Sequence, residues 1–446
     1  MDPEPAPLTE RISPPLSNTY VPREHEPDAS EIDKIRKWQE ERIERRLRGE
    51  YESAVLRLGD LIRGSMATPM RISSIRVQGA VQTRSSFLNW LIEPHLSQAK
   101  KDDTSTLKDV LTSTKHITNT LLEADIFSVV NPRIETSRDA LSRPGDVDLV
   151  LSARQKGRYF LKTSTELGDQ EGSVSIQGRS RNTFGGAETL EAAFSSGLKT
   201  RLAGHIALSA PISPNLKTHG EISVFGLEKD LTGFASCVEG VRGLRAIIRS
   251  TGVRTTNEVA YEAALRHVHA LTQAASLSIR EAAGHSTKSS LSHSWCYDSR
   301  NDKAVPSRGG YFRSYHELAG LGGSAAFLKS QLAFQVARGI FTGSTLSFSG
   351  KAGCLYELYG RPARFNDRFQ LGGPLDYSVL LHILSGRSFA DNIRTSISRP
   401  CISAGVGLLY RLEPVRVELN FGVPLIASRS DAHRRGFQIG IGLDFL

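Results

Sequence analysis

Two histidines near the middle of the chain have the spacing that comes nearest to metal chemistry. His267 and His269 would share one face of a strand, because alternate strand side chains point the same way. No carboxylate or cysteine stands beside them at ligand spacing, so we interpret them as lumenal or surface histidines and predict no metal site. Gly320 to Ala325 formally fits the dinucleotide-binding pattern GxGxxA, but no βαβ unit surrounds it, and a turn at a strand end is the better interpretation.

The sequence lacks the motifs of common hydrolases and nucleotide-binding enzymes, since it contains no GxSxG, HExxH or GxxxxGKS/T run. Its four cysteines are widely spaced and form no CxxC pair: Cys237, Cys296, Cys354 and Cys401. We interpret them as reduced thiols rather than as a disulfide framework or a zinc site. We therefore predict a protein without enzymatic chemistry and without a cofactor.

The C-terminal stretch predicts another kind of chemistry, which is recognition through backbone pairing. In Gly436 to Leu446, apolar side chains alternate with polar or small ones, so one face of a terminal strand is apolar. An unpaired apolar edge invites aggregation unless another strand covers it, and the simplest closure is a β-barrel. A barrel whose apolar faces point outward belongs in lipid, where every backbone polar group is satisfied within the protein.

The composition allows this architecture. The chain has 446 residues, of which 39% are apolar and 23% charged, and no run of 18 or more apolar residues could form a transmembrane helix. Barrel strands need only about 9 to 11 alternating residues, so a membrane barrel stays possible. The N-terminus has neither the basic nor the apolar region of a secretory signal, and we expect a eukaryotic organelle reached from the cytosol. The net charge of +9 is dispersed along the chain, which argues against nucleic acid as a partner.

The first 65 residues divide into two segments. Residues 1–29 are rich in proline and polar side chains and predict a disordered extension. Residues 30–65 place apolar residues near helical spacing among dense charges and predict a charged amphipathic helix. This helix would either rest, solvated, on the neighbouring domain or dock to a membrane surface or partner.

Residues 71–156 predict a compact α+β domain with the order strand, helix, helix, strand, strand. The expected strands are 72–77, 128–135 and 147–153, and the expected helices are 84–96 and 107–125. Such domains are often adaptors that offer a strand edge for β-augmentation.

Residues 157–446 consist of alternating segments and predict the barrel itself. The clearest segment runs from Val415 to Val423, with aliphatic and aromatic side chains on one face and polar ones or glycine on the other. At roughly 18 residues per strand and connection, this region holds about sixteen strands. The least clear stretch is 242–282, in which residues 257–271 could also be drawn as a helix.

Three stretches of the predicted barrel carry motifs in a specific order. The first, Arg181 to Glu188 after Gly168 to Gly172, contains Asn182, Phe184, Gly185 and Gly186. The second contains Asp298 and Arg300, followed by Pro306 and Gly309, with Asn301 where a second acid would stand. The third, beginning at Phe369 and Gln370, contains Leu371, Gly372, Gly373 and Pro374. Together these stretches resemble the outer-membrane assembly superfamily that includes bacterial BamA, specifically its mitochondrial member in the sorting and assembly machinery.

The resemblance implies the fold class: a membrane all-β protein with a transmembrane β-barrel of about sixteen strands, one α+β POTRA domain before it and an N-terminal helix. It also implies the function, which is the insertion of β-barrel precursors into the mitochondrial outer membrane, with the POTRA domain in the intermembrane space. The implied partners are these precursors, other assembly subunits and the lipid bilayer. A lateral gate would open between the first strand, about 158–168, and the last, 436–446. A passive solute or protein-conducting pore is the alternative function, and a soluble β-rich binding protein is a third.

The chain departs from the family pattern in the third motif. The family's loop continues into a VRGF-like run whose arginine contacts the inner barrel wall, whereas the matching positions here read Tyr377, Ser378, Val379 and Leu380. Arg368 or Arg387 could substitute for that arginine, or the loop has diverged in function.

The C-terminal strand also fits the mitochondrial barrel sorting signal, which has the form polar-x-Gly-x-x-hydrophobic-x-hydrophobic. The matching residues are Gln438, Gly440, Leu443 and Phe445. We therefore expect this strand to direct the protein's own insertion as well as to form one side of the gate.

Overall fold

The computed structural model describes most of the chain: residues 29–47, 57, 59–99, 105–139, 142–168, 171–198, 200–303, 306–341, 344–361, 363–369, 378–383, 401–412, 415–426 and 436–443. The predicted disordered extension lies outside these residues, apart from Ala29. The chain forms two compact units, and residues 77–95, 116–133 and those from 151 onward belong to the larger one. The predicted domain boundaries at 65, 71 and 156 therefore stay predictions.

A small three-stranded sheet with two helices follows the N-terminal helix α2 (Ala29–Leu47). Its elements are β1 (Arg71–Gln78), α4 (Ser85–Ala99), α5 (Leu107–Glu123), β2 (Phe127–Thr136) and β3 (Asp146–Gln155), and its strand order is β1-β3-β2. The predicted order and bounds of these elements are confirmed to within a few residues. At the start of α5, the Asp109 carboxylate accepts hydrogen bonds from the Thr106 backbone and side chain, which fixes where that helix begins.

Helix α5 buries one face, because its apolar residues recur every three or four positions. Val110, Ile117 and Leu121 are at most 2% exposed, whereas the next residue, Leu122, is 38% exposed. The central strand β3 contributes Leu149 and Leu151, which are also nearly inaccessible to solvent.

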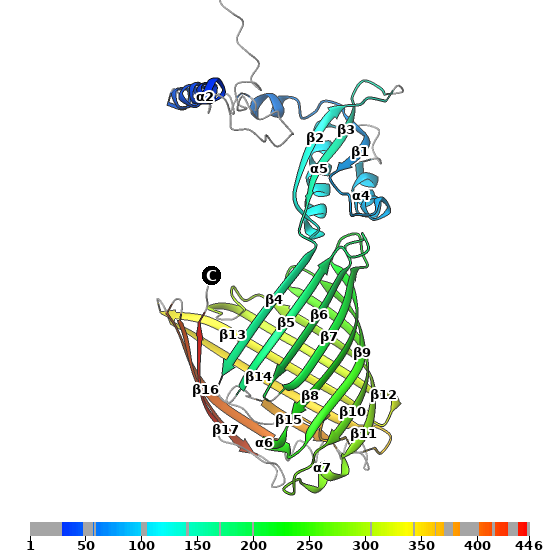
Figure 1. Ribbon diagram of the computed structural model, residues 1–446, viewed down its shortest axis with the longest axis vertical. Coiled ribbons are helices and arrows are strands. Elements are labelled where there is room, and N and C mark those ends of the chain that lie inside the picture. Colours follow the sequence, from blue (N-terminus) through cyan, green and yellow to red (C-terminus); the bar gives the residue numbers. More distant parts are fainter. Residues whose placement is uncertain are drawn as a thin grey trace, which may run out of the picture. The chain divides into compact units, whose positions relative to one another are not determined.

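A second, large sheet contains fifteen strands in chain order (Figure 1). They are β4 (Tyr159–Gly168), β5 (Glu171–Arg181), β6 (Thr189–Gly197), β7 (Thr200–Pro211), β8 (Thr218–Asp230), β9 (Val238–Thr251), β10 (Thr255–His269), β11 (Gly284–Asp298), β12 (Arg308–Gly323), β13 (Phe327–Phe341), β14 (Ser344–Glu357), β15 (Ser378–Ile383), β16 (Cys401–Leu412), β17 (Val415–Ile426) and β18 (Gly436–Leu443). Neighbouring strands pair antiparallel except β14 and β15, which run parallel. Figure 1 shows the sheet as a curved wall, with β12 to β14 seen behind β5 to β8.

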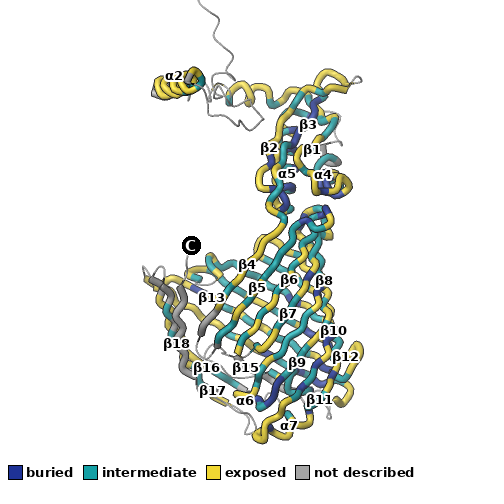
Figure 2. The backbone as a smooth tube through the Cα atoms, viewed as in Figure 1, coloured by how far each residue is buried: buried dark blue, intermediate teal, exposed yellow. Residues whose placement is uncertain are grey.

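The two faces of the large sheet reverse the pattern of a water-soluble protein. We call the face with Ile206, Val224 and Leu244 the outer face, and these side chains are 54 to 56% exposed. The opposite, inner face carries small and polar side chains, including the buried Ser223 and Arg266. Figure 2 shows the resulting alternation of exposed and more buried residues along β4 to β9. In the described part of the chain, no helix is both long and apolar enough to cross a bilayer.

The structure resolves several open points in the sequence. Residues 257–271, which could be drawn as a helix, lie almost entirely in strand β10. Among the described residues that connect the strands of the large sheet, there are two short helices, α6 (Thr232–Ala235) and α7 (Leu277–Glu281). Within the predicted N-terminal helix 30–65, the described residues up to Leu47, residue 57 and residues 59–64 are helical, whereas residues 48–56 and 58 lie outside the described residues. Gly320 to Ala325 does form a strand end, since β12 ends at Gly323. Sixteen strands stays a prediction, because fifteen are described.

The burial of α5 generates a matched pair of variants. We expect Leu121→Ala to lower the free energy of unfolding around α5 by about 2–5 kcal/mol, because it leaves a cavity at a fully buried position. Leu122→Ala should change it by less than about 1 kcal/mol, since that side chain is partly in solvent. Hydrogen–deuterium exchange of the α5 amides in the full chain measures both, and equal exchange in the two variants would contradict the assignment of the buried face.

Candidate functional site

The first sequence motif forms a loop between β5 and β6, and this loop hydrogen bonds to residues 82–84, which precede α4. Asn182 is 5% exposed, and its side-chain amide donates to the Gln82 carbonyl at 3.2 Å and to the Thr83 hydroxyl at 3.1 Å. The Asn182 Oδ1 accepts from the Ala187 amide at 3.0 Å. Its backbone has φ of 54°, a left-handed conformation that asparagine tolerates better than most residues. One asparagine therefore closes the loop and holds the neighbouring segment.

The two glycines of this loop allow a close backbone approach. The Arg84 amide donates to the Gly185 carbonyl at 2.8 Å, and a Cβ at Gly185 would lie 3.0 Å from the Gln82 carbonyl oxygen. The Arg84 guanidinium also forms an ion pair with Glu188, whose carboxylate accepts from the Gly186 amide. Phe184 takes no part in these contacts and is 61% exposed. The loop thus joins residues 82–84 to the large sheet through both backbone and charge.

The second motif lies at the same end of the sheet, where β11 ends and β12 begins. Arg300 donates to both carboxylate oxygens of Asp298 at 2.9 Å, a bidentate pair, and to the Gln335 side chain on β13 at 2.7 Å. The guanidinium also lies 4.5 Å from the ring centre of Tyr311. This motif ties three neighbouring strands together at their ends.

The turn of the second motif depends on Asn301 and Gly309. The Asn301 Oδ1 accepts from the backbone amides of Ser307 and Arg308 at 3.0 and 2.9 Å, which shows why an amide can replace the family's acid here. Gly309 has φ of 107°, and a Cβ there would lie 2.3 Å from the Ser299 carbonyl oxygen. Pro306 stands in the turn just before β12.

A third cluster binds the segment that follows β14, residues 363–369, to the inner face of the sheet. The Asp367 Oδ1 accepts from Arg266 of β10 at 2.7 Å, and both side chains are largely buried, at 3% and 8% exposed. Lys329 of β13 donates to the Asp367 carbonyl at 2.9 Å and lies 4.6 Å from the ring centre of Phe369. Asn366 hydrogen bonds Glu239 of β9. The segment is therefore held by polar contacts from β9, β10 and β13.

Apolar contacts hold the same segment. Ala363 is buried with Ala319, Phe327 and Leu355, and Phe369 packs against this cluster. Phe365 packs against a second cluster formed by Ala235, Cys237 and Val268. Ion pairing and apolar burial together fix residues 363–369 against the inner wall.

The inner face beside this segment carries a network of balanced charges. Lys288 of β11 lies between Glu262 and Glu317, at 3.2 and 2.6 Å. Arg249 donates to Glu258 at 3.0 Å. Inward charges are therefore paired across neighbouring strands, as buried charges require.

Strands β4 and β18, the predicted first and last strands, are the two edges of the large sheet. β4 pairs only with β5, and β18 only with β17, within the described residues. In the β17–β18 ladder, Gln438 lies opposite Asn420, Gly440 opposite Glu418 and Leu443 opposite Val415. Phe445 lies outside the described residues, and so do Leu371, Gly372, Gly373 and Pro374.

The histidines singled out in the sequence lie on the outer face. His267 stacks on His285, with ring centres 4.1 Å apart, and lies 4.9 Å from the ring of His269. Within the described residues, no three His, Cys, Asp or Glu side chains are placed to hold a metal ion. Cys237, Cys296 and Cys354 are free thiols, which agrees with the predicted reduced state of those three.

Comparison with known proteins decides the family. Residues 182–392 match the Omp85 superfamily domain. A SAM50-like protein of Schizosaccharomyces pombe is 29% identical, with 87% of this chain and 94% of the relative covered. The sorting and assembly machinery component 50 homolog of Mus musculus is 30% identical, with 73% of this chain and 81% of the relative covered. This chain belongs to the sorting and assembly machinery component 50 family.

A solved structure supports the fold of this family member. The crystal structure of BamA from Haemophilus ducreyi lacking POTRA domains 1–3 has a TM-score of 0.64 at 11% identity, with 83% of this chain and 84% of that chain covered. At that identity the likeness shows the fold alone.

The structure of this member of the sorting and assembly machinery component 50 family describes part of the departure from the family loop. Ser378 to Leu380 begin strand β15, where Ser378 lies opposite Lys351 of β14. The proposed substitute Arg368 points to the Ala363 carbonyl of its own segment, at 2.9 Å, and Arg387 lies outside the described residues. Among the described residues, the ion pair between segment 363–369 and the inner face has its acid on the segment and its arginine on β10. Sequence reasoning missed Arg266 and Asp367, because the two stand 101 residues apart in no recognisable motif.

The first motif generates a test of its asparagine. Asn182→Asp keeps the acceptor for Ala187 but loses both donated hydrogen bonds and places a charge near the Gln82 carbonyl. We expect loss of about 1–3 kcal/mol, which speeds hydrogen exchange of the 182–188 amides roughly five- to 150-fold. Phe184→Ala is the control and should leave this exchange unchanged, since Phe184 is mostly exposed. Unchanged exchange in Asn182→Asp would show that the donated bonds do not hold the loop.

The third cluster generates a test of its ion pair. Arg266→Gln leaves Asp367 buried without its partner, and we expect segment 363–369 to open more easily by about 3–5 kcal/mol. Arg368→Gln is the matched control, because Arg368 is exposed and, among the described residues, bonds within its own segment. Hydrogen exchange of residues 363–369 measures both variants. The double variant Arg266→Asp with Asp367→Arg should recover part of the loss, and no recovery would mean that the pair acts through packing alone.

Proposed function

We propose that this chain folds and inserts β-barrel precursor proteins into the mitochondrial outer membrane, without enzymatic chemistry. The observation that carries the proposal is the pair of edges, β4 and β18, at the two ends of an otherwise continuous fifteen-strand ladder. A free strand edge presents unpaired N–H and C=O groups, and it binds an extended peptide by adding it as a further strand. Membership of the sorting and assembly machinery component 50 family supports the same function.

In this proposal the large sheet closes as a barrel in the membrane. Its outer face carries exposed aliphatic and aromatic side chains, while its inner face carries paired charges. A membrane requires this arrangement, because the lipid core has no water for polar side chains or free backbone groups. The small sheet with α4 and α5 acts as a single POTRA domain in the intermembrane space. The partners are β-barrel precursors, other assembly subunits and the lipid bilayer.

The gate lies where β4 meets β18. The β4–β5 ladder has ten residue pairs and the β17–β18 ladder eight. Three of the eight β18 residues are glycines, Gly436, Gly440 and Gly442, which add no side-chain packing to the strand. β18 is therefore the strand that separates from the gate, and a precursor strand pairs with the β4 edge in its place. The side chains of the precursor strand set the register, because a slip of one residue reverses its faces.

The passive-pore alternative fits the structure less well. Residues 363–369 lie against the inner wall, held by contacts from three strands, where an unobstructed pore would be lined by water. An assembly factor uses the seam and does not need a wide open lumen.

Locking the seam tests the proposal. In a background with all four cysteines replaced by serine, one cysteine is placed at Thr163 or Thr165 of β4 and one at Ile439 or Ile441 of β18. We expect the oxidised protein to stay folded but to stop assembling new barrel precursors, because the edges no longer separate. Assembly is followed by the appearance of folded, membrane-inserted precursor in isolated mitochondria.

A second disulfide serves as the control for the seam lock. Cysteines at Leu419 and Ile439 join β17 to β18, which already lie directly opposite one another. This variant should assemble precursors at the normal rate after oxidation. Continued assembly by the seam-locked protein would rule out the lateral gate, and a steady conductance without crosslinks to precursors would favour the pore.

A further inference from the structure

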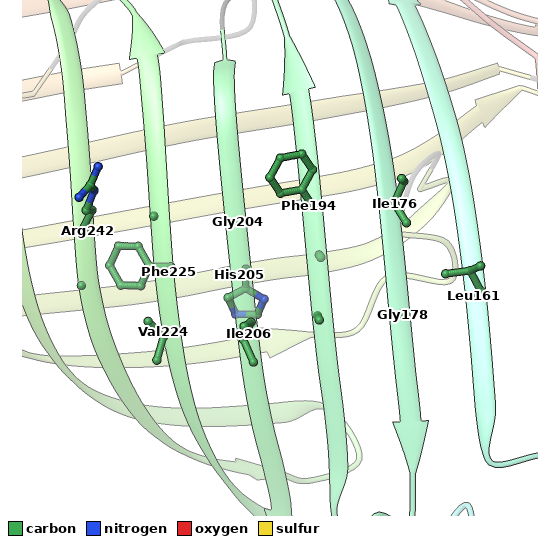
Figure 3. Close-up of a pocket in the computed structure, with 14 residues that line it drawn as sticks. Leu161, Ile176, Gly178, Phe194, Gly204, His205, Ile206, Val224, Phe225 and Arg242 are labelled. Atoms are coloured by element: carbon green, nitrogen blue, oxygen red, sulfur yellow. The ribbon is translucent and has the colours of Figure 1, made fainter.

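The outer face of strands β5 to β8 is hollowed by a groove that no side chain of the described chain fills (Figure 3). Its volume is about 680 Å³, within the range of roughly 300–1,000 Å³ that is usual for small-molecule pockets. Four small residues form its floor: Gly178, Ala192, Gly204 and Gly226. The strand register brings them together, because Gly178 lies opposite Ala192 and Gly204 lies opposite Gly226.

The sides of the groove are apolar. Leu161, Phe194, Ile206 and Val224 line it, and each of these side chains is between 50 and 72% exposed. They lie on the outer face, since Ala192 is opposite Ile206 and Ile206 is opposite Val224. In the membrane of the proposed function, on which this inference rests, lipid is the medium that faces the groove.

One cation, Arg242, stands at the end of the groove (Figure 3). It lies on the outer face of β9, opposite Gly226 on one side and Leu265 on the other. Within the described residues, its guanidinium has neither an ion pair nor a hydrogen bond. The nearby acids do not neutralise it, because Glu228 and Asp230 both pair with Arg201, at 3.6 and 2.9 Å.

The position of Arg242 along the strand fits the level of lipid headgroups. Towards the middle of β9, the next outer-face residues are Leu244, Ala246 and Ile248, which are apolar. Towards the N-terminal end of β9, the next outer-face position is Gly240, which lies between Glu228 of β8 and His267 of β10. His285 of β11 lies opposite His267, so this row of residues across the sheet is polar. Arg242 therefore marks the border between the apolar band and the polar rim, where long basic side chains meet phosphate groups.

We propose that this groove binds one membrane phospholipid, with its phosphate on the Arg242 guanidinium and an acyl chain over the floor of small residues. Arginine suits this role, because its planar fork donates two parallel hydrogen bonds to a phosphate. An anionic phospholipid has both an apolar chain and an adjacent negative charge. The apolar lining of the groove suits the chain, and Arg242 suits the charge. The groove extends to the edge strand β4, to which Leu161 belongs, so the lipid supports the part of the sheet next to the gate.

Native mass spectrometry of the purified full-length chain in detergent tests the site. The probes are dioleoyl phosphatidylglycerol, dioleoylglycerol, which has the same chains without phosphate, and inorganic phosphate. We expect the phosphatidylglycerol to be retained, the dioleoylglycerol to be retained about fivefold less and the phosphate not at all.

Variants separate the two halves of the site. Arg242→Gln should lower retained phosphatidylglycerol about fivefold, to the level of dioleoylglycerol, and Arg242→Lys should keep most of it. Gly204→Leu should abolish retention by filling the groove. A Cβ at Gly204 meets only the Phe194 ring, at 4.0 Å, so the backbone accepts the change. Ala246→Leu adds the same side chain elsewhere on the outer face of β9 and should leave retention unchanged.

Two results would overturn the proposal. Equal retention of phosphatidylglycerol by Gly204→Leu and the unchanged chain would show that lipid does not occupy the groove, and a second copy or a partner helix would then be its occupant. Equal retention of phosphatidylglycerol and dioleoylglycerol would remove Arg242 from the site. Retention is read on the purified chain and assembly on precursors in mitochondria, so failure of this proposal and failure of the assembly function are distinguishable.

Discussion

The large sheet depends on continuous backbone pairing between neighbouring strands. From β4 to β18, each strand pairs with its neighbours in chain order, with only two residue pairs between β15 and β16, and β4 and β18 are the two edges of the described sheet. Because pairing satisfies the backbone, the side chains of the outer face are free to be apolar. The inner face can then hold charges, each of which needs a partner. Within the described sheet, β4 and β18 each have one whole side without a neighbouring strand.

The inner wall is held by charge as well as by strands. Lys288 is shared by two glutamates, and Arg266 receives Asp367 from a segment far away in the chain. A buried pair of this kind adds little net stability compared with apolar packing, but it penalises any arrangement that separates its members. Its main effect is therefore specificity of position. It places residues 363–369 on one part of the wall and excludes others.

Much of this fold follows from the period of the sequence, and the exceptions are instructive. Alternation over 415–423 located β17, and helical spacing located α5, because both patterns are local. The ambiguity at 257–271 arose because β10 carries Ala260, Ala264 and Val268 on its inner face, a spacing of four that also fits a helix. The motif at Asn182 was recognised from its residues, but its contact with residues 82–84 crosses about 100 residues and leaves no local trace. The Arg266–Asp367 pair was invisible for the same reason.

The parallel pairing of β14 and β15 determines the directions of the two edge strands. In an all-antiparallel sheet of fifteen strands, the first and last would point the same way, because direction alternates at every step. The single parallel step removes one alternation, so β4 and β18 run in opposite directions. They thus have the relation that an even-numbered antiparallel sheet would give them. In the proposed function, an incoming strand that pairs antiparallel with β4 then has the direction of β18 itself, and it takes the place of that strand without any reversal of the chain.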